Sequence, residues 1–286
     1  LCATGAVYSE RAGFSNIILE GAMLTGAFTA VTGSYFFGSP TVALLCTILL
    51  GVLLGIIYAA VVLQLRGNAI VVGIAINLLA IGLTTFLLPV IYGVSGSIVS
   101  ERIIGLSKYT IPVLSSIPGI GGMFTKQTLL TYFSWVFVVF THFVLYNTKF
   151  GMNLRACGEN PSAAQAVGVN VILIRYIGSI ITSVCCMLGG AQMSLGLLSL
   201  FSEEMTGGRG FIALAAVTFA KANPNRIMVI CFLFGICEAI SNQLQVYGFP
   251  PQLISMIPYI AVVVFLIADS VIVRSRQKQK KLSTAN

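Results

Sequence analysis

Long apolar segments separated by short polar connections make up most of the chain. The segments cover residues 14–37, 41–63, 68–91, 128–147, 172–198, 211–222, 226–247 and 253–273. A helix needs about 20 residues to cross about 30 Å of hydrocarbon, and only the segment 211–222 is far shorter than that. We therefore expect an all-α polytopic helix bundle of about eight apolar segments, folded as a single domain over residues 1–286.

One polar stretch, residues 148–171, interrupts this pattern between two long segments. Asn160 is a good N-cap and Pro161 suits the first position of a helix, while the small residues that follow end at Gly168. The stretch predicts a short, narrow helix that faces water. An ordinary loop between two spans is the alternative interpretation.

The composition agrees with an integral membrane protein. Hydrophobic residues make up 57% of the chain and charged residues 8%, whereas about a quarter of the residues in a water-soluble domain are charged. We place the stretch 148–171 and the basic tail 274–286 in the cytoplasm, and residues 92–127 in an extracellular loop. Of the 16 Lys and Arg residues, four then lie outside, namely Arg102, Lys108, Lys126 and Arg209. This distribution follows the positive-inside rule if the segment 211–222 crosses the membrane.

The net charge of +8 therefore reflects topology and contact with membrane lipids, not nucleic-acid binding. No G-x-x-x-x-G-K-[ST] phosphate loop is present, and the seven cysteines show no metal-ligand spacing. We find no set of catalytic residues and no metal site, so we expect a protein that is not itself an enzyme and binds no cofactor.

The two halves of the chain resemble each other weakly. Ser9-Glu10 precedes a run that ends at Pro40, and Ser202-Glu203 precedes a run that ends at Pro224. On the topology above, one copy starts inside and the other outside, as an inverted repeat requires. Chance similarity between apolar sequences is the alternative.

A glycine-rich break, residues 207–210, lies just before the short segment 211–222. We expect it to leave free backbone N–H groups near membrane depth, which would contact polar ligand atoms through Gly208 and Gly210. Arg209 in the same break is a candidate for the substrate pathway or for contact with an external receptor. A tight extracellular turn is the alternative interpretation.

Polar residues also follow helical spacing inside the apolar segments. Glu238, Ser241, Asn242 and Gln245 form one stripe, Asn77 lies near Thr84 and Thr85, and Asn16 pairs with Glu20 at a spacing of four. Such groups are costly in lipid, so we expect them to line a wet pathway, or else to link helices through hydrogen bonds. Gly51-x-x-x-Gly55 predicts a close helix-packing face.

Four motifs in order carry a resemblance to a known family. They are Ser9-Glu10-Arg11-x-Gly13-x-x-Asn16-Ile17-x-x-Glu20-Gly21, Ala75-Ile76-Asn77-Leu78, Gly151-x-Asn153-Leu154-Arg155-Ala156-x-Gly158-Glu159-Asn160-Pro161, and Gly208-Arg209-Gly210-Phe211-Ile212-Ala213-Leu214-Ala215-Ala216. Over most of its length the chain resembles the permeases of bacterial ABC importers for nucleosides and simple sugars, especially the shorter permease of nucleoside importers that use a basic-membrane-protein lipoprotein as receptor.

The resemblance implies a multi-pass protein of the bacterial cytoplasmic membrane with several partners. These are a second permease subunit, a cytoplasmic ABC ATPase that binds ATP and Mg, and an extracellular substrate-binding lipoprotein. It also implies that the stretch 148–171 is the coupling loop that docks on the ATPase, through Arg155, Gly158, Glu159, Asn160, Pro161, Ala163, Ala164 and Gly168.

The family has a membrane helix before the Ser-Glu-Arg motif, whereas only residues 1–8 precede it here, so we expect an incomplete amino terminus. Nucleosides are the expected substrates, with ribose-like sugars and branched-chain amino acids as alternatives. A secondary transporter that works without ATP is a further alternative, with Glu20 and Glu238 as its candidate coupling residues.

Overall fold

The computed structural model describes residues 1–110, 125–246 and 260, except for the side chains of residues 242, 245 and 246. The helices are α1 (Cys2–Arg11), α2 (Leu19–Phe37), α3 (Pro40–Ala59), η1 (Ala60–Gln64), α4 (Ala69–Tyr92), α6 (Leu129–Asn147), α7 (Lys149–Glu159), α8 (Pro161–Ala166), α9 (Val171–Ala191), η3 (Gln192–Leu198), α10 (Arg209–Phe219) and α11 (Pro224–Val246). Both η1 and η3 are π-helical and directly continue α3 and α9. The described part of the chain is thus mostly helical.

Five of these helical stretches are long and apolar enough to cross a membrane. They are Pro40–Gln64, Ala69–Tyr92, Leu129–Asn147, Val171–Leu198 and Pro224–Ser241. Each matches a predicted segment, and the short segment 211–222 is observed as the 11-residue helix α10. Apart from residue 260, the predicted segment 253–273 lies outside the described residues, as does the tail 274–286.

The predicted apolar segment 14–37 is observed as a helix only from Leu19 onward, so its predicted beginning is wrong. Helix α1 ends at Arg11, and α2 begins only at Leu19. Between them, Gly13 has φ +80, and the side chain of Asn16 accepts a hydrogen bond from the Ile18 N–H at 3.2 Å. These local features favour an irregular backbone over a helix, although the composition of the region is apolar.

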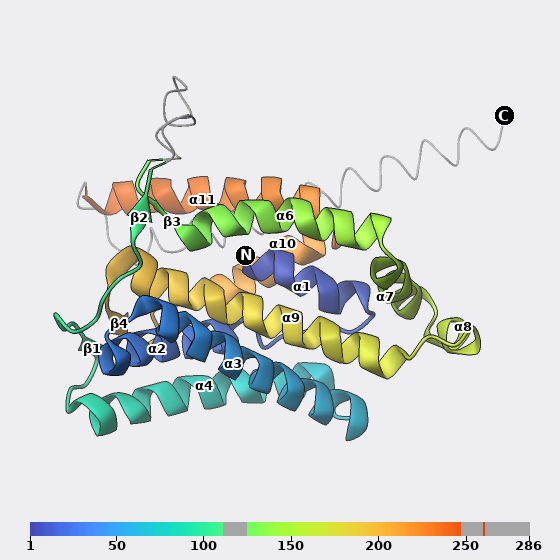
Figure 1. Cartoon of the computed structure of the whole chain (residues 1–286), viewed down its shortest axis with the longest axis horizontal. Helices are drawn as coiled ribbons and strands as arrows, with labels where there is room; N and C mark the ends of the chain where they lie inside the picture. The colour runs from blue at the N-terminus through green and yellow to red at the C-terminus, as the bar shows by residue number, and fades with distance from the viewer. Residues whose placement is uncertain (111–124, 247–259, 261–286) are drawn as a thin grey trace.

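Helix α9 runs through the middle of the bundle (Figure 1) and packs against α1, α2 and α3. Helices α3 and α4 lie on one side of it, and α6 and α11 lie on the other. A Cβ on Gly55 would lie 2.7 Å from Ile180 Cα, and one on Gly51 would lie 3.0 Å from Val184 Cα. The close packing face predicted for Gly51-x-x-x-Gly55 is therefore confirmed, with α9 as its partner.

The two ends of the bundle differ. Helices α7 and α8 project from one end, and the short strands gather toward the other (Figure 1). Strands β1 (Ser97–Ile98) and β4 (Phe201–Ser202) pair antiparallel, with Ser97 opposite Ser202. Strands β2 (Lys108–Tyr109) and β3 (Gln127–Thr128) form a second antiparallel pair. The β1–β4 pair joins the connection after α4 to the chain just before α10.

Candidate functional site

The backbone before α10 turns sharply and brings the start of this helix into the bundle. Gly207 and Gly208 have φ values of +51 and +79, which glycine adopts without steric cost. Gly210, which also belongs to the glycine-rich break, does not have a positive φ. The turn ends at Gly208, the N-cap of α10.

Glu20, in the first turn of α2, binds the start of α10. Its carboxylate accepts hydrogen bonds from Thr206 Oγ1 at 2.6 Å, from the Gly208 N–H at 2.9 Å and from the Gly210 N–H at 2.6 Å. The positive end of the helix dipole favours a carboxylate at this place. Our expectation of free N–H groups at the break is therefore wrong for Gly208 and Gly210, because Glu20 occupies both.

The two helices approach so closely here that a side chain at Gly210 has no room. A Cβ on Gly210 would lie 2.5 Å from both the Cα and the backbone nitrogen of Glu20. Glu20 itself is 7% exposed. The glycine at position 210 therefore serves contact between two helices, whereas the glycine at 208 serves the turn.

Arg209 and Glu238 form an ion pair between α10 and α11. Arg209 Nε donates to Glu238 Oε1 at 2.7 Å, and Nη2 donates to the same oxygen. Nη1 of Arg209 also donates to the Met205 carbonyl at 3.2 Å. The side chains are 38% and 36% exposed, so the pair is accessible from a space inside the structure and is not sealed in its core.

Asn77 of α4 binds the first turn of α2. Its Oδ1 accepts from the Gly21 N–H at 2.8 Å, and its Nδ2 donates to the Ile17 carbonyl at 2.9 Å. The first bond satisfies a backbone N–H that the helix start leaves without an intrahelical partner, and the second satisfies a carbonyl of the irregular segment before the helix. The geometry therefore favours the helix-linking interpretation of Asn77 over the pathway interpretation.

A continuous line of polar contacts thus joins four helices. It runs from Asn77 on α4 to the start of α2, from Glu20 on α2 to the start of α10, and from Arg209 on α10 to Glu238 on α11. The sequence identified the members of this line but not their partners. We call it the polar line below.

One further predicted pathway residue, Asn16, does not join the polar line. Asn16 is buried in the irregular connection before α2, so the expected helical pairing with Glu20 is wrong. Its Nδ2 has no hydrogen-bond partner among the described residues. The side chains of Asn242 and Gln245 lie outside the described residues.

A cavity of about 400 Å³ lies beside the ion pair, between α1, α6, α9, α10 and α11. Its polar lining consists of Thr131, Ser134, Gln192, Arg209 and Glu238. Gln192 accepts from Thr128 Oγ1 at 2.6 Å and donates to Thr131 at 3.2 Å. Our sequence reasoning missed Gln192, although an amide inside an apolar segment is the same signal that identified Asn77. It also begins the π-helical turn η3, a feature frequent at functional sites.

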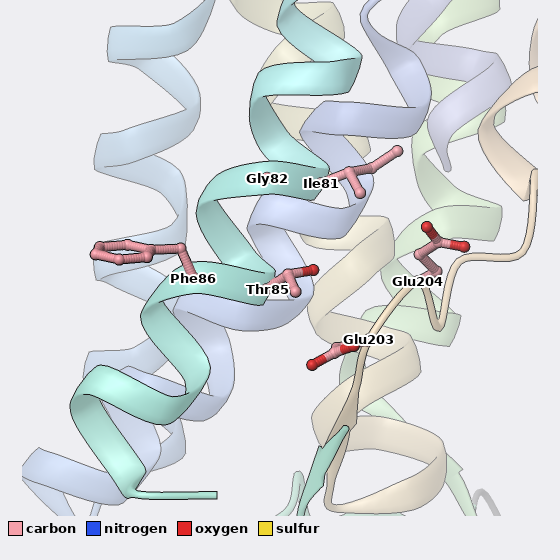
Figure 2. Close-up of a pocket in the computed structure, with 6 residues that line it drawn as sticks. All are labelled: Ile81, Gly82, Thr85, Phe86, Glu203 and Glu204. Atoms are coloured by element: carbon pink, nitrogen blue, oxygen red, sulfur yellow. The ribbon is translucent and has the colours of Figure 1, made fainter. Parts of the chain in front are cut away.

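A second pocket, of about 590 Å³, opens between α4 and the chain after β4 (Figure 2). Ile81 and Thr85 point from α4 toward Glu203 and Glu204, whereas Phe86 points away (Figure 2). Glu203 is already bonded, because its Oε1 accepts from the Gly96 N–H at 3.0 Å. This pocket lies next to the glycine break in the chain but outside the polar line.

The predicted helix after Asn160 is observed as α8. The Asn160 side chain accepts from the Ala163 N–H at 3.1 Å, Pro161 is the first helical residue, and the helix ends two residues before Gly168, whose φ is +85. Glu159 and Ala163 are exposed, but Ala164 is buried at 3% exposure. The two small residues therefore lie on different faces of α8: Ala163 is exposed and Ala164 packs inward.

Two other residues of the stretch 148–171 contact the bundle. The Arg155 guanidinium lies 5.1 Å from the centroid of the Tyr146 ring on α6, an arrangement suited to a cation–π interaction. Gly158 packs against the backbone of residues 11–13, since a Cβ on Gly13 would lie 2.8 Å from Gly158 Cα. Cys157 beside it is fully buried, and this burial raises the pKa of its thiol. Helix α7 is thus fastened to the end of α1.

Comparisons with known proteins give a consistent result. The sequence model of the family described as "Branched-chain amino acid transport system / permease component" matches residues 1–266. The chain is 36% identical to the "Nucleoside ABC transporter permease protein NupC" of Lactococcus lactis over 273 residues, which cover 92% of this chain and 85% of the relative. It is 36% identical to the "Guanosine ABC transporter permease protein NupQ" of Bacillus subtilis over 278 residues, or 93% and 86% of the two chains.

A third relative has a different named substrate. The "Putative glucose ABC transporter permease protein TsgC13" of Haloferax volcanii is 35% identical over 254 residues, or 86% of this chain and 74% of the relative. No solved structure gives a significant match.

Proposed function

The chain belongs to the family of permease components of branched-chain amino acid transport systems, and we propose that the substrate of this membrane permease is a nucleoside. The observation that carries the proposal is the similarity to NupC and NupQ, whose names specify nucleosides and guanosine. Both alignments cover more than nine-tenths of this chain. The family model matches residues 1–266, which include the polar line as well as α7 and α8. The protein itself is a transport subunit and not an enzyme.

The proposed complex contains a cytoplasmic ABC ATPase, an external substrate-binding lipoprotein and a second permease subunit. ATP and Mg bind to the ATPase. The names of the relatives support an ATPase and a binding partner, and the exposed end of the bundle at α7 and α8 supports the place where the ATPase docks. That end also carries the basic residues Arg66, Lys149, Arg155 and Arg175, as the cytoplasmic side should.

The proposed pathway passes beside the polar line. Arg209 and Glu238 offer charged hydrogen-bonding groups, and Gln192, Thr131 and Ser134 offer an amide and hydroxyls on the same cavity. These groups suit a neutral ligand that is rich in hydroxyls and ring nitrogens. Asn16, Asn242 and Gln245 remain candidate pathway residues.

The proposed mechanism is alternating access. ATP draws the two ATPase modules together, their motion moves α7 and α8, and the cavity changes the side on which it opens. The receptor supplies most of the affinity, so the cavity needs few specific contacts.

We also propose that the inverted repeat expected from the sequence is present here. In support, α2 and α10 both begin after an irregular segment, and their starts meet at Glu20 and Gly210. A repeat would relate two such helix starts across the membrane plane. We also propose that the predicted segments beyond the five observed candidate spans cross the membrane.

A sugar such as glucose is the second candidate substrate. TsgC13 supports it, with an identity only one percentage point below those of NupC and NupQ. Nucleosides and sugars share the vicinal hydroxyls of a furanose or pyranose ring, so the cavity chemistry alone does not separate them. The purine or pyrimidine base is what separates them.

The test is uptake of labelled guanosine, uridine, glucose and leucine in cells that carry the complete transporter and lack their own nucleoside uptake. The proposal expects guanosine and uridine to accumulate and a tenfold excess of unlabelled glucose or leucine not to compete. Accumulation of glucose or leucine alone would assign the permease to another substrate class.

A further inference from the structure

Both ends of α10 are held by side chains from one short segment, residues 11–20. Glu20 accepts hydrogen bonds from the Gly208 and Gly210 N–H groups at the start of α10. At the other end, Arg11 Nε donates to the Ala222 carbonyl at 2.9 Å, and Arg11 Nη2 donates to the Lys221 carbonyl at 3.1 Å. A carboxylate and a guanidinium nine residues apart therefore hold opposite ends of the same helix.

The charges suit the ends that they hold. The start of a helix carries a partial positive charge and its end a partial negative charge, so an anion at the start and a cation at the end are both favourable. Helix α10 has 11 residues and is therefore about 16 Å long at about 1.5 Å per residue. The segment 11–20 thus spans the full length of α10, from Ala222 to Gly208.

The end held by Arg11 has an unusual backbone. Lys221 and Ala222 both have φ +50, a left-handed conformation that residues other than glycine adopt only where their surroundings enforce it. The guanidinium binds both of their carbonyls at once. Lysine lacks this fork of donors, so it does not replace arginine at such a site.

The same segment touches α7, which leads into α8. Gly13 and Gly158 bring their backbones into direct contact, since a Cβ on Gly13 would lie 2.8 Å from Gly158 Cα. Arg175 Nε, from the first turns of α9, donates to the Ala12 carbonyl at 3.1 Å. Residues 11–13 are thus the place where α1, α7, α9 and the end of α10 meet.

We propose that residues 11–20 form a rigid connector that transmits motion from α7 and α8 to α10, and that Arg11 is the positioning residue that makes α10 follow. This inference rests on the proposed ATP-driven transport. Movement of α7 displaces residues 11–13 through the Gly13–Gly158 contact. Arg11 and Glu20 then carry α10 along, and with it the ion pair of Arg209 and Glu238.

The first test measures coupling in the complete transporter, reconstituted in liposomes with its ATPase, second permease and guanosine-loaded receptor. Arg11→Gln removes the bidentate contact, and Arg11→Lys keeps only its charge. Arg66→Gln is the matched control, because it removes one positive charge from the same end of the bundle. ATP hydrolysis with and without loaded receptor, guanosine uptake and subunit stoichiometry are measured for each.

For both Arg11 variants we expect basal ATP hydrolysis to persist while uptake falls. The ATP hydrolysed per guanosine imported should rise about tenfold, within the range typical of coupling between two sites. A structural role alone would lower hydrolysis and uptake together and leave that ratio unchanged. An unchanged ratio in fully assembled Arg11→Gln transporters would overturn the proposal, whereas no guanosine uptake by the wild type would contradict the substrate assignment instead.

The second test needs neither transport nor an Arg11 variant. Spin labels at Ser15 and Thr218, two exposed positions on the connector and on α10, are introduced into a cysteine-free permease. We expect their distance to stay the same in the nucleotide-free and ATP-bound transporter, while the distance from Thr218 to Leu83 on α4 changes. A change in the Ser15–Thr218 distance between the two states would overturn the proposal, even if the Arg11 variants failed to assemble.

Discussion

Gly210 is the residue whose replacement the structure constrains most tightly. A Cβ there would lie 2.5 Å from the backbone of Glu20, and backbone atoms do not move aside as flexible side chains do. We expect Gly210→Ala to destabilise the permease by about 1–3 kcal/mol, as overpacking typically does, and to abolish most uptake because Glu20 no longer reaches the N–H groups of α10. Thermal unfolding of the purified permease and uptake in cells are the measurements.

Gly235→Ala is the matched control. Gly235 lies in α11, and a Cβ there meets no atom of the described residues within 4 Å. Alanine at a helix interior position is more favourable than glycine by about 0.5–1 kcal/mol, so this variant should be at least as stable as the wild type. Equal stability and uptake for both alanine variants would show that the contact between α2 and α10 is not tight.

The ion pair of Arg209 and Glu238 has a different expected signature. Both side chains are more than a third exposed, so the pair should contribute about 0–1 kcal/mol to stability. We expect Glu238→Gln and Arg209→Gln to change the melting temperature little but to lower guanosine uptake strongly, because they remove polar groups from the proposed pathway. Loss of stability with normal uptake per folded permease would instead assign the pair to packing.

The sequence predicted that Glu20, Asn77, Arg209 and Glu238 matter, but not how they pair. A buried carboxylate or amide in an apolar segment is conspicuous, because burial without a partner is costly. Which group satisfies it depends on residues up to 190 positions away, as in the bond between Gly210 and Glu20. Spacing along one helix carries no information about such distant partners.

At the scale of elements, α8 depends on its N-cap. Asn160→Ala removes the acceptor for the Ala163 N–H and should cost about 1 kcal/mol of local helix stability. We expect weaker binding of the ATPase to the permease and lower uptake. Asn160→Asp keeps the acceptor, so ATPase binding and uptake should both stay near the wild-type level. The measurement is co-purification of the ATPase with the wild type and with each of the two variants. Equal recovery with the alanine and aspartate variants would contradict a role for the folded α8 in docking.

The helix starts and ends were predicted unevenly. The cap at Asn160 and the stop before Gly168 were readable, because short polar signals stand out between long apolar segments. The break at residues 12–18 was not, because Gly13 and Asn16 lie within a region whose apolar composition suits a span. Hydropathy measures the solvent preference of the side chains and does not report whether the backbone is helical.

At the scale of the whole molecule, the bundle combines an internal polar region with an end from which two short helices project. The polar line joins α4, α2, α10 and α11, and the cavity beside it lies between α1, α6, α9, α10 and α11. Helices α7 and α8 project from one end of the bundle (Figure 1). Residues 11–20 contact both regions. An importer subunit needs this combination, because the energy is delivered at one end of the protein and used in its interior.

We propose that ATP hydrolysis by a partner subunit drives nucleosides through this permease. The most direct measurement is guanosine uptake into proteoliposomes that contain the complete transporter, with ATP on the side of α7 and α8, in parallel with an ATPase that binds but does not hydrolyse ATP. We expect guanosine to accumulate only with the active ATPase, independently of proton and sodium gradients, and glucose not to accumulate. Equal accumulation with the inactive ATPase, driven by an ion gradient, would contradict it.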